Sequence, residues 1–350
     1  MPRLPKIDPE SVPGTVNEIV NETRARVTKL AKWLSEQGKL LLPHPFPEND
    51  EIERRIQETS APLRESGMFP SEDGTPIYYE VRGEGRPLVL CYGLTCRREH
   101  WHYQIGPLSH RYRVILLDYR GHHRSGVPAN EMNLTLSWCA RDVRAVMNHL
   151  RLDEAVCLGH SMGVPVVSMV AGLEPERVKA CVFICGAVSN PFEHMFFTDR
   201  LGTVHRASAL LFDNAPELMG KVWGALTTHN PFSYFLTSRF GFNPQSARER
   251  DILMYMEGVN ATPLTVFHRL LNDYVSKVSK EVVTQVICPT LVVAGDSDFI
   301  TPIEVQQEMA ELMPSSEFFP VSGGSHNAHM DSPEAVNERI FEFLKAIEYV

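Results

Sequence analysis

The sequence predicts an α/β fold in which a mostly parallel, doubly wound sheet carries an inserted helical cap and follows an N-terminal helical extension. The core is predicted because short apolar runs typical of buried strands alternate with helix-length amphipathic segments, both before residue 188 and after residue 284. The cap is predicted because the aromatic-rich residues 188–284 interrupt this alternation. With 350 residues, of which 43% are hydrophobic, the chain is long enough for one large domain and an accessory element.

Residues 1–67 form the predicted extension, and its main element is an amphipathic helix over residues 15–37. Thr15 and Glu18 have the spacing of a capping box, apolar residues recur at helical spacing, and Gly38 ends the pattern. We expect the apolar face to pack against the catalytic domain or a sister subunit, so the chain could form a homo-oligomer through this helix. Adsorption to a lipid surface is the alternative, which the mixed charges of the polar face weaken.

A short helix is predicted over residues 52–59 and a loop over residues 62–73. The predicted core begins at residue 68, within this loop. Predicted strands cover residues 76–82, 86–93, 112–118, 155–161, 180–186, 289–295 and 316–321. Predicted helices cover residues 136–150, 164–173, 304–313 and 334–347. This pattern divides the core into residues 68–187 and 285–350, on either side of the cap at residues 188–284.

The charge and the cysteine content exclude several kinds of partner. The formal net charge is -9 and the Lys and Arg residues are scattered, so we expect no nucleic-acid partner. The seven cysteines are an odd number, and most lie in or beside apolar runs, which predicts reduced thiols. The spacing of Cys181 and Cys185 would suit a metal site, but no Cys/His pair elsewhere completes a tetrahedral set. We therefore expect no metal and no cofactor.

The N-terminal residues lack the apolar stretch and the small-residue cleavage site of a secretory signal. No run of about 18 apolar residues occurs in the sequence, which argues against a membrane span. We therefore expect a cytoplasmic protein.

A Gly-His-Ser-Met-Gly motif at residues 159–163 lies between an apolar strand and a helix. On such a sharp strand-to-helix turn, flanking glycines remove the Cβ atoms that would collide, and the serine hydroxyl is exposed above the sheet. The positive end of the following helix stabilises negative charge there. This context predicts that Ser161 is a nucleophile rather than part of a glycine-rich turn without chemical role.

Four motifs together resemble the α/β-hydrolase superfamily over residues 70–348. They are the motif around Ser161, the segment VVAGDSDFITP, the histidine loop GGSHNAHMDSPEAV, and the oxyanion-loop motif Tyr92-Gly93-Leu94 followed by Trp101. The nucleophile, the acid and the histidine also stand in the family's chain order.

The resemblance implies a catalytic triad. Ser161 would be the nucleophile, His326 the general base, and Asp298 the residue that orients this base. The backbone N–H groups of Leu94 and Met162 would form the oxyanion hole.

Some neighbours could compete for these roles. Asp296 also follows the strand, but the family's segment matches Asp298, so Asp296 is expected to be a turn residue. His329 could rival His326, but the Gly-Gly-Ser lead-in belongs to His326. The remaining candidates are expected to be structural rather than catalytic: His122, His123 and His160.

Residues 118–125 resemble the family's D-x-R-G-x-G-x-S segment, whose Asp and Arg usually brace loops near the pocket. The sequence departs from the family twice: His123 stands where glycine is common, and Tyr92 where many members have histidine. Both departures change the polar lining close to the oxyanion hole. The residues expected to contact substrate are Tyr92, Gly93, His160 and Trp223.

The resemblance also narrows the reaction. Dehalogenases and epoxide hydrolases of this architecture use aspartate at the elbow, whereas this chain has Ser161. We therefore expect a serine hydrolase that cleaves a carboxylic ester, lactone or thioester of an apolar small molecule through an acyl-enzyme. An acyltransferase, a perhydrolase or a C–C hydrolase would use the same triad, and a receptor without turnover would retain the fold. The aromatic and Met residues of the cap either line an apolar pocket or form the cap's own core.

Overall fold

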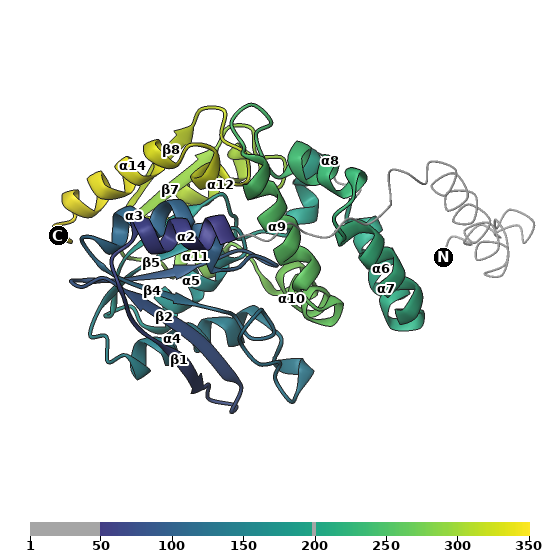
Figure 1. The fold of residues 1–350 in the computed structure, drawn as a ribbon, viewed down its shortest axis with the longest axis horizontal. Helices are drawn as coiled ribbons and strands as arrows, with labels where there is room; N and C mark the ends of the chain where they lie inside the picture. The colour runs from purple at the N-terminus through teal and green to yellow at the C-terminus, as the bar shows by residue number, and fades with distance from the viewer. Residues whose placement is uncertain (1–49, 198–200) are drawn as a thin grey trace, which may run out of the picture.

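The computed structural model describes residues 50–197 and 201–350, which form an eight-stranded sheet flanked by helices (Figure 1). The strand order is β1-β2-β4-β3-β5-β6-β7-β8. β2 pairs antiparallel with β1 and β4, and the pairs from β4 to β8 in this order are parallel. The predicted mostly parallel, doubly wound sheet is thus confirmed. The strands are β1 (Leu63–Pro70), β2 (Pro76–Arg82), β3 (Pro87–Cys91), β4 (Arg113–Leu117), β5 (Ala155–His160), β6 (Val178–Ile184), β7 (Thr290–Gly295) and β8 (Ser316–Val321).

The central strands are nearly continuous apolar runs because both faces of the sheet are covered. Every residue of β5 and β7 is buried. The parallel register places Val89 of β3 between Ile115 of β4 and Cys157 of β5. Since β3, β5, β7 and β8 run in the same direction, the loops that follow them meet at one edge of the sheet, where the candidate site lies.

Helices cover both faces of this sheet. α2, α3 and α14 pack together at the front of Figure 1, whereas α4 and α5 pack together on the other face. Their bounds are α2 (Asp50–Thr59), α3 (His102–Ser109), α4 (Leu136–His149), α5 (Gly163–Leu173), α12 (Ile303–Glu311), α13 (Ala328–Asp331) and α14 (Pro333–Ala346). Within residues 50–197 and 201–350, no helix is long and apolar enough to cross a lipid bilayer.

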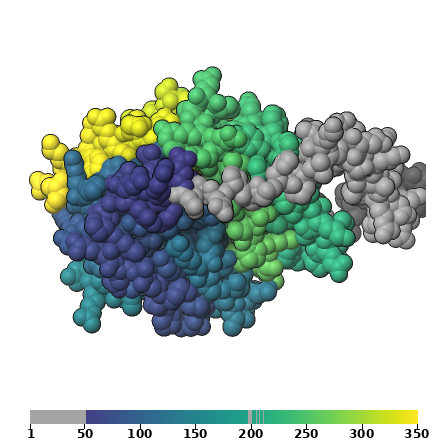
Figure 2. Space-filling model, in the orientation of Figure 1, coloured from purple at the N-terminus to yellow at the C-terminus, as the bar shows by residue number. Residues whose placement is uncertain are grey.

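The described residues between β6 and β7 are mostly helical, as the sequence predicts for residues 188–284. The helices are α6 (Leu201–Asn214), α7 (Pro216–Thr227), α8 (Pro231–Phe240), α9 (Glu249–Ala261), α10 (Leu264–Lys277) and α11 (Glu281–Thr284). α7 packs on α6, α8 and α9, so the helices of this insertion pack against one another. Figure 2 shows the green part of this insertion as a lobe beside the yellow C-terminal part.

β1 corrects the interpretation of residues 62–73 as a loop. Leu63–Pro70 pairs antiparallel with β2 at the edge of the sheet. Of its side chains only Phe69 is fully buried, so no apolar alternation marks this strand in the sequence. The expected start of the core at residue 68 falls inside β1, and the other segment boundaries stay predictions. The helix expected over residues 15–37 lies outside the described residues.

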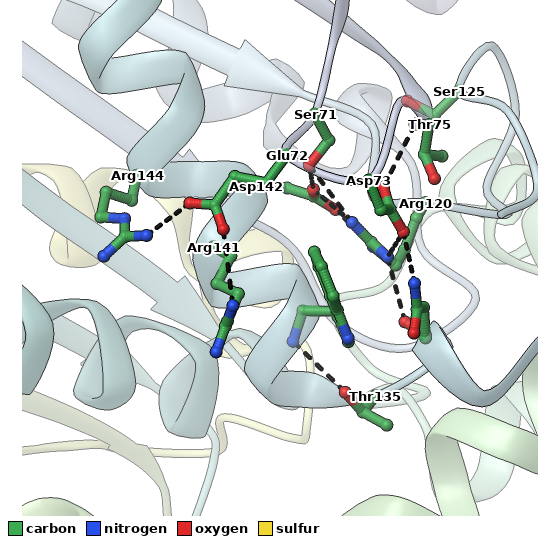
Figure 3. Close-up of polar contacts among 12 residues, drawn as sticks. Ser71, Glu72, Asp73, Thr75, Arg120, Ser125, Thr135, Arg141, Asp142 and Arg144 are labelled. Carbon is green, nitrogen blue, oxygen red and sulfur yellow. Dashed lines mark hydrogen bonds and ion pairs between the residues drawn. The ribbon is translucent and has the colours of Figure 1, made fainter. Parts of the chain in front are cut away.

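Arg120 joins three segments of the core (Figure 3). Its buried guanidinium donates to both carboxylate oxygens of Asp142 on α4, at 2.7 and 2.6 Å. It also pairs with Asp73, in the turn between β1 and β2, at 3.0 Å. The ring of Trp138 lies 4.6 Å from the guanidinium carbon. These contacts support the structural role expected of the segment that contains Arg120.

Candidate active site

Ser161 lies on a strained turn between β5 and α5. Its φ angle is 53°, a left-handed conformation that costs a non-glycine residue about 1–3 kcal/mol. A Cβ atom at Gly159 would lie 2.5 Å from the Gly163 carbonyl oxygen, and one at Gly163 would lie 2.2 Å from the Cys91 carbonyl oxygen. Only glycine therefore fits at either position, which explains the spacing of the motif.

His326 lies between Ser161 and Asp298. Its Nε2 is 2.8 Å from Ser161 Oγ. Its Nδ1 is 3.0 Å from Asp298 Oδ2 and 3.2 Å from Asp298 Oδ1. His326 comes from the loop after β8 and Asp298 from the loop after β7, so parallel strands bring the three predicted residues together.

Asp298 is held by donors that the sequence reasoning missed. Its Oδ1 accepts hydrogen bonds from the N–H groups of Ile300 and Thr301, at 2.8 and 2.9 Å, and its Oδ2 accepts one from Thr301 Oγ1 at 2.7 Å. Gln306 Nε2 donates to the Thr301 carbonyl at 2.7 Å. These bonds stabilise the negative charge of the carboxylate and fix its direction toward His326. The Asp-x-x-Thr spacing at residues 298–301 was the available signal.

A second buried carboxylate, Asp331, fixes the loop that carries His326. Its Oδ2 accepts bonds from both the N–H and the hydroxyl of Ser325, at 2.9 and 2.5 Å. The Ser325 hydroxyl and the Asn327 amide also contact the carbonyl of Gly241, just after α8. The cap and the loop around His326 are therefore tied together.

The two rival residues do not contact Ser161. Asp296 is exposed and accepts the N–H of Gly323 at 2.8 Å, as a turn residue does. His329 is fully buried, with its ring 4.5 Å from that of His160. No contact with Ser161 involves either residue in the described part of the chain.

The loop after β3 approaches Ser161 closely. A Cβ atom at Gly93 would lie 2.9 Å from the Cβ of Ser161. The next residue is Leu94, and Met162 begins the turn into α5. In the loops and turns that the structure describes, neither the Leu94 nor the Met162 N–H donates to another backbone carbonyl. Both N–H groups therefore fit the predicted role in an oxyanion hole, which stays a proposal.

The cap also holds this loop. Thr95 has a φ of 64°, and a Cβ atom at Gly258 of α9 would lie 2.7 Å from the Thr95 carbonyl oxygen. Beside Gly258, Glu257 pairs with Arg97 at 2.9 Å. α9 thus packs directly on the residues that follow Leu94, a contact that the sequence alone did not indicate.

The two histidines after Arg120 support the same loop from the other side. His122 Nε2 lies 3.3 Å from the Thr95 N–H, and burial lowers the pKa of His122 to about 3, so this nitrogen is free to accept. His123 Nε2 is 3.2 Å from the Cys96 carbonyl. The φ of His123 is 42°, which explains why glycine is common at this position in the family.

The side chain of Tyr92, an expected substrate contact, bonds within the protein. Its side chain is buried, and its hydroxyl donates to Asp118 Oδ1 and accepts the Tyr119 N–H, both at 3.1 Å. Burial raises the pKa of Asp118 to about 6. Both hydrogen-bonding capacities of the hydroxyl are used within the protein, so Tyr92 supports the loop, and its contact with substrate stays a prediction.

The other expected substrate contacts lie in different places. His160 is buried, and its Nε2 is 2.9 Å from the His326 carbonyl, so it supports the backbone of His326. Trp223 lies on α7, and its ring is tilted against that of Phe267 with ring centroids 4.2 Å apart. Among the described residues, no contact joins Trp223 to Ser161. Its role as a substrate contact stays a prediction.

Buried histidines lie near His326. The His160 ring lies 5.3 Å from the His326 ring. Burial lowers the pKa of His160 to about 3 and holds those of His100 and His329 well below the ordinary value. These rings are neutral at pH 7 and add no positive charge beside His326. Within residues 50–197 and 201–350, no three or more His, Cys, Asp or Glu side chains are arranged to hold a metal ion.

Comparison with known proteins agrees with this architecture. The (E)-2-((N-methylformamido)methylene)succinate hydrolase of Acinetobacter baylyi is 27% identical over 279 residues, covering 79% of this chain and 96% of that protein. Est816, an N-acyl homoserine lactone degrading enzyme, is 26% identical with a TM-score of 0.62, covering 81% of this chain and 100% of the other. The enol-lactonase from Burkholderia xenovorans LB400 shares the fold, with 20% identity and a TM-score of 0.66 over 80% of this chain and 100% of that one.

The alpha/beta hydrolase fold family matches residues 86–333. This range is more than half of the chain and contains Ser161, Asp298 and His326. The chain therefore belongs to the α/β-hydrolase fold family and is a hydrolase of that family.

Proposed function

We propose that this hydrolase cleaves a carboxylic ester, lactone or thioester of an apolar small molecule through an acyl-enzyme on Ser161. The observation that carries the proposal is the pair of contacts made by His326: 2.8 Å to Ser161 Oγ and 3.0 Å to Asp298 Oδ2. A serine hydroxyl alone is a weak nucleophile, and an imidazole within hydrogen-bond reach activates it.

In this proposal His326 Nε2 takes the hydroxyl proton as Ser161 Oγ attacks the substrate carbonyl carbon. Asp298 keeps the imidazole in the tautomer with Nδ1 protonated and stabilises the imidazolium. The Leu94 and Met162 N–H groups donate to the oxyanion; each such donor contributes about 2.7–4 kcal/mol to transition-state stabilisation. His326 then protonates the leaving group. In the second half of the reaction, His326 takes a proton from water as the water attacks the acyl carbon, and it returns this proton to Ser161 as the free acid leaves.

An apolar substrate is proposed because aromatic side chains from the cap and the core meet beside Asp298. The rings of Phe196 and Phe240 lie 4.9 Å apart, and those of Phe240 and Phe299 6.1 Å apart. The Phe196 N–H donates to the Phe299 carbonyl at 2.7 Å, which anchors the start of the cap next to the acid. A lactone substrate would agree with Est816, which degrades N-acyl homoserine lactones.

The proposal is tested by treating the protein with a fluorophosphonate and measuring its intact mass. One adduct, mapped to Ser161 and absent in Ser161→Ala, is expected. The matched control is Ser168→Ala, since Ser168 is a buried serine on α5 that donates to the Val164 carbonyl. An unlabelled wild-type protein that is folded would contradict the proposal and favour a receptor without turnover.

A panel of activated esters, lactones and thioesters then assigns the substrate class. Turnover beyond one equivalent, with the free acid as product, supports hydrolysis. Transfer of the acyl group to an added alcohol or to hydrogen peroxide would instead support an acyltransferase or a perhydrolase, and cleavage confined to a carbon–carbon bond would support a C–C hydrolase. All of these results would leave Ser161 as the nucleophile.

A further inference from the structure

Two thiols outside the candidate site lie close together. Cys181 on β6 and Cys288, just before β7, have their sulfur atoms 3.7 Å apart. The sheet brings them together, because Cys181 pairs with Thr290 in the parallel register and its N–H donates to the Pro289 carbonyl at 3.0 Å. Cys181 is fully buried, whereas Cys288 is partly exposed. The pair thus combines a partly exposed cysteine with a buried cysteine whose sulfur lies 3.7 Å from its own.

We propose that Cys181 and Cys288 form an oxidation site, at which a hydroperoxide converts the two thiols into an intramolecular disulfide. A disulfide bond is about 2.05 Å long, so the sulfur atoms must approach each other by less than about 2 Å. Cys288 precedes β7, so the movement falls on the segment before this strand rather than on the paired residues of β6 and β7.

The reaction has two steps. The Cys288 thiolate attacks one peroxide oxygen, the O–O bond breaks, and water or an alcohol leaves; the sulfur becomes a sulfenic acid, oxidised by two electrons, and the peroxide is reduced by two. The Cys181 sulfur then attacks the Cys288 sulfur, the S–O bond breaks, and water leaves with the Cys181 proton. A dithiol reductant reverses the process by thiol–disulfide exchange.

The local contacts assign these two roles. The contact with the Cys181 thiol lowers the pKa of Cys288, while the same contact raises the pKa of Cys181. Cys288 is also the more exposed residue of the two, so it is the thiol that an oxidant meets first. In contrast, burial raises the pKa of Cys91 and of Cys96 to about 12, so these thiols are poor nucleophiles.

The disulfide is expected to stabilise the folded protein, because it joins two residues that lie far apart in the sequence. The two residues are 107 positions apart, and α6 to α11 all lie between them. The disulfide would close this entire insertion into a covalent loop at its base. In the chain-entropy account, closing a loop of this length restricts the unfolded chain strongly. The oxidised protein is therefore expected to unfold at a higher temperature than the reduced protein.

The full chain is reduced with dithiothreitol, desalted, treated with hydrogen peroxide and blocked with N-ethylmaleimide. We expect a mass lower by about 2 Da before blocking, two fewer blocked thiols, and a cross-linked peptide pair containing Cys181 and Cys288. Dithiothreitol should restore both thiols. The melting temperature of the oxidised protein should be higher by on the order of 5 °C.

Cys288→Ser should abolish the mass change and the shift in melting temperature. The matched control is Cys139→Ser, since Cys139 is a buried thiol on α4 away from the pair and should leave both unchanged. Three results would overturn the proposal: no loss of thiols, a sulfinic acid on Cys288 with Cys181 still blocked, or a cross-link to another cysteine. The peptide map of the wild-type protein decides this even if a variant fails to fold.

Discussion

Replacing His160 with glutamine should make the stability of the protein less sensitive to acid. Burial lowers the pKa of His160 to about 3, whereas a histidine in an unfolded chain has a pKa of about 6.5. Below pH 6.5 the unfolded chain therefore binds a proton that the folded protein excludes. Stability contributed by neutral His160 is present above pH 6.5 and is lost as the pH falls toward 3.

The magnitude follows from the 1.5 pH units between 6.5 and 5. At about 1.4 kcal/mol per unit, the free energy of unfolding should lose about 2 kcal/mol from His160 alone between pH 7 and pH 5. This value does not depend on the folded pKa as long as that pKa lies well below 5. Glutamine keeps an N–H donor for the His326 carbonyl, which His160 Nε2 contacts at 2.9 Å, but it does not titrate.

The assay is urea denaturation followed by fluorescence at pH 7 and pH 5, for the wild type and for His160→Gln. The loss of unfolding free energy should be about 2 kcal/mol smaller in the variant. His110→Gln serves as the control, since His110 is an exposed histidine at the end of α3. Parallel stability changes in the wild type and His160→Gln would refute the reasoning, because they would mean that His160 takes up its proton in the folded protein.

Three further predictions concern the site and its supports. Asp298→Asn should reduce kcat by on the order of 10⁴-fold while the variant stays folded, since the amide cannot hold His326 in the right tautomer; near-normal kcat would exclude Asp298 as the orienting acid. Gly258→Ala should lower kcat/KM by about 10-fold or more, because its Cβ would lie 2.7 Å from the Thr95 carbonyl oxygen and would displace the loop that carries the Leu94 N–H. The control is Gly224→Ala, whose Cβ would meet no atom within 4 Å and which should match the wild type in the same assay. Arg120→Met should lower the free energy of unfolding by about 3–5 kcal/mol, because it leaves the Asp142 carboxylate buried and unpaired; a loss below about 1 kcal/mol in urea titration would show that water reaches this carboxylate.

The strands from β3 to β7 were predictable because they are largely buried and leave near-continuous apolar runs in the sequence. β1 was not, because an edge strand with exposed side chains needs no such run. Ser161 could be placed from its own motif, since a sharp strand-to-helix turn requires glycines on both sides of the serine. His326 and Asp298 needed the family resemblance, because their proximity to Ser161 depends on the order of parallel strands.

The supports of the site could not be predicted, because they depend on side-chain direction and on contacts between distant segments. Tyr92 occupies the expected place in the chain, but its hydroxyl turns toward Asp118. The spacing of Asp298 and Thr301 in the sequence was a signal, but the direction of the Thr301 hydroxyl toward the carboxylate depends on the turn between them. The contact between Gly258 and Thr95 joins residues far apart in sequence, and nothing in the pattern around either of them indicates it.

The contact between Gly258 and Thr95 limits how this enzyme can be redesigned. Insertions between β6 and β7 are an obvious unit to exchange between relatives when a new specificity is wanted. In this chain, however, α9 also sets the position of the loop that follows β3, so a graft that omits a glycine at residue 258 would displace that loop. A recombination library should therefore take α9, the helix α7 that packs on it, and residues 93–98 from the same parent, and vary α6.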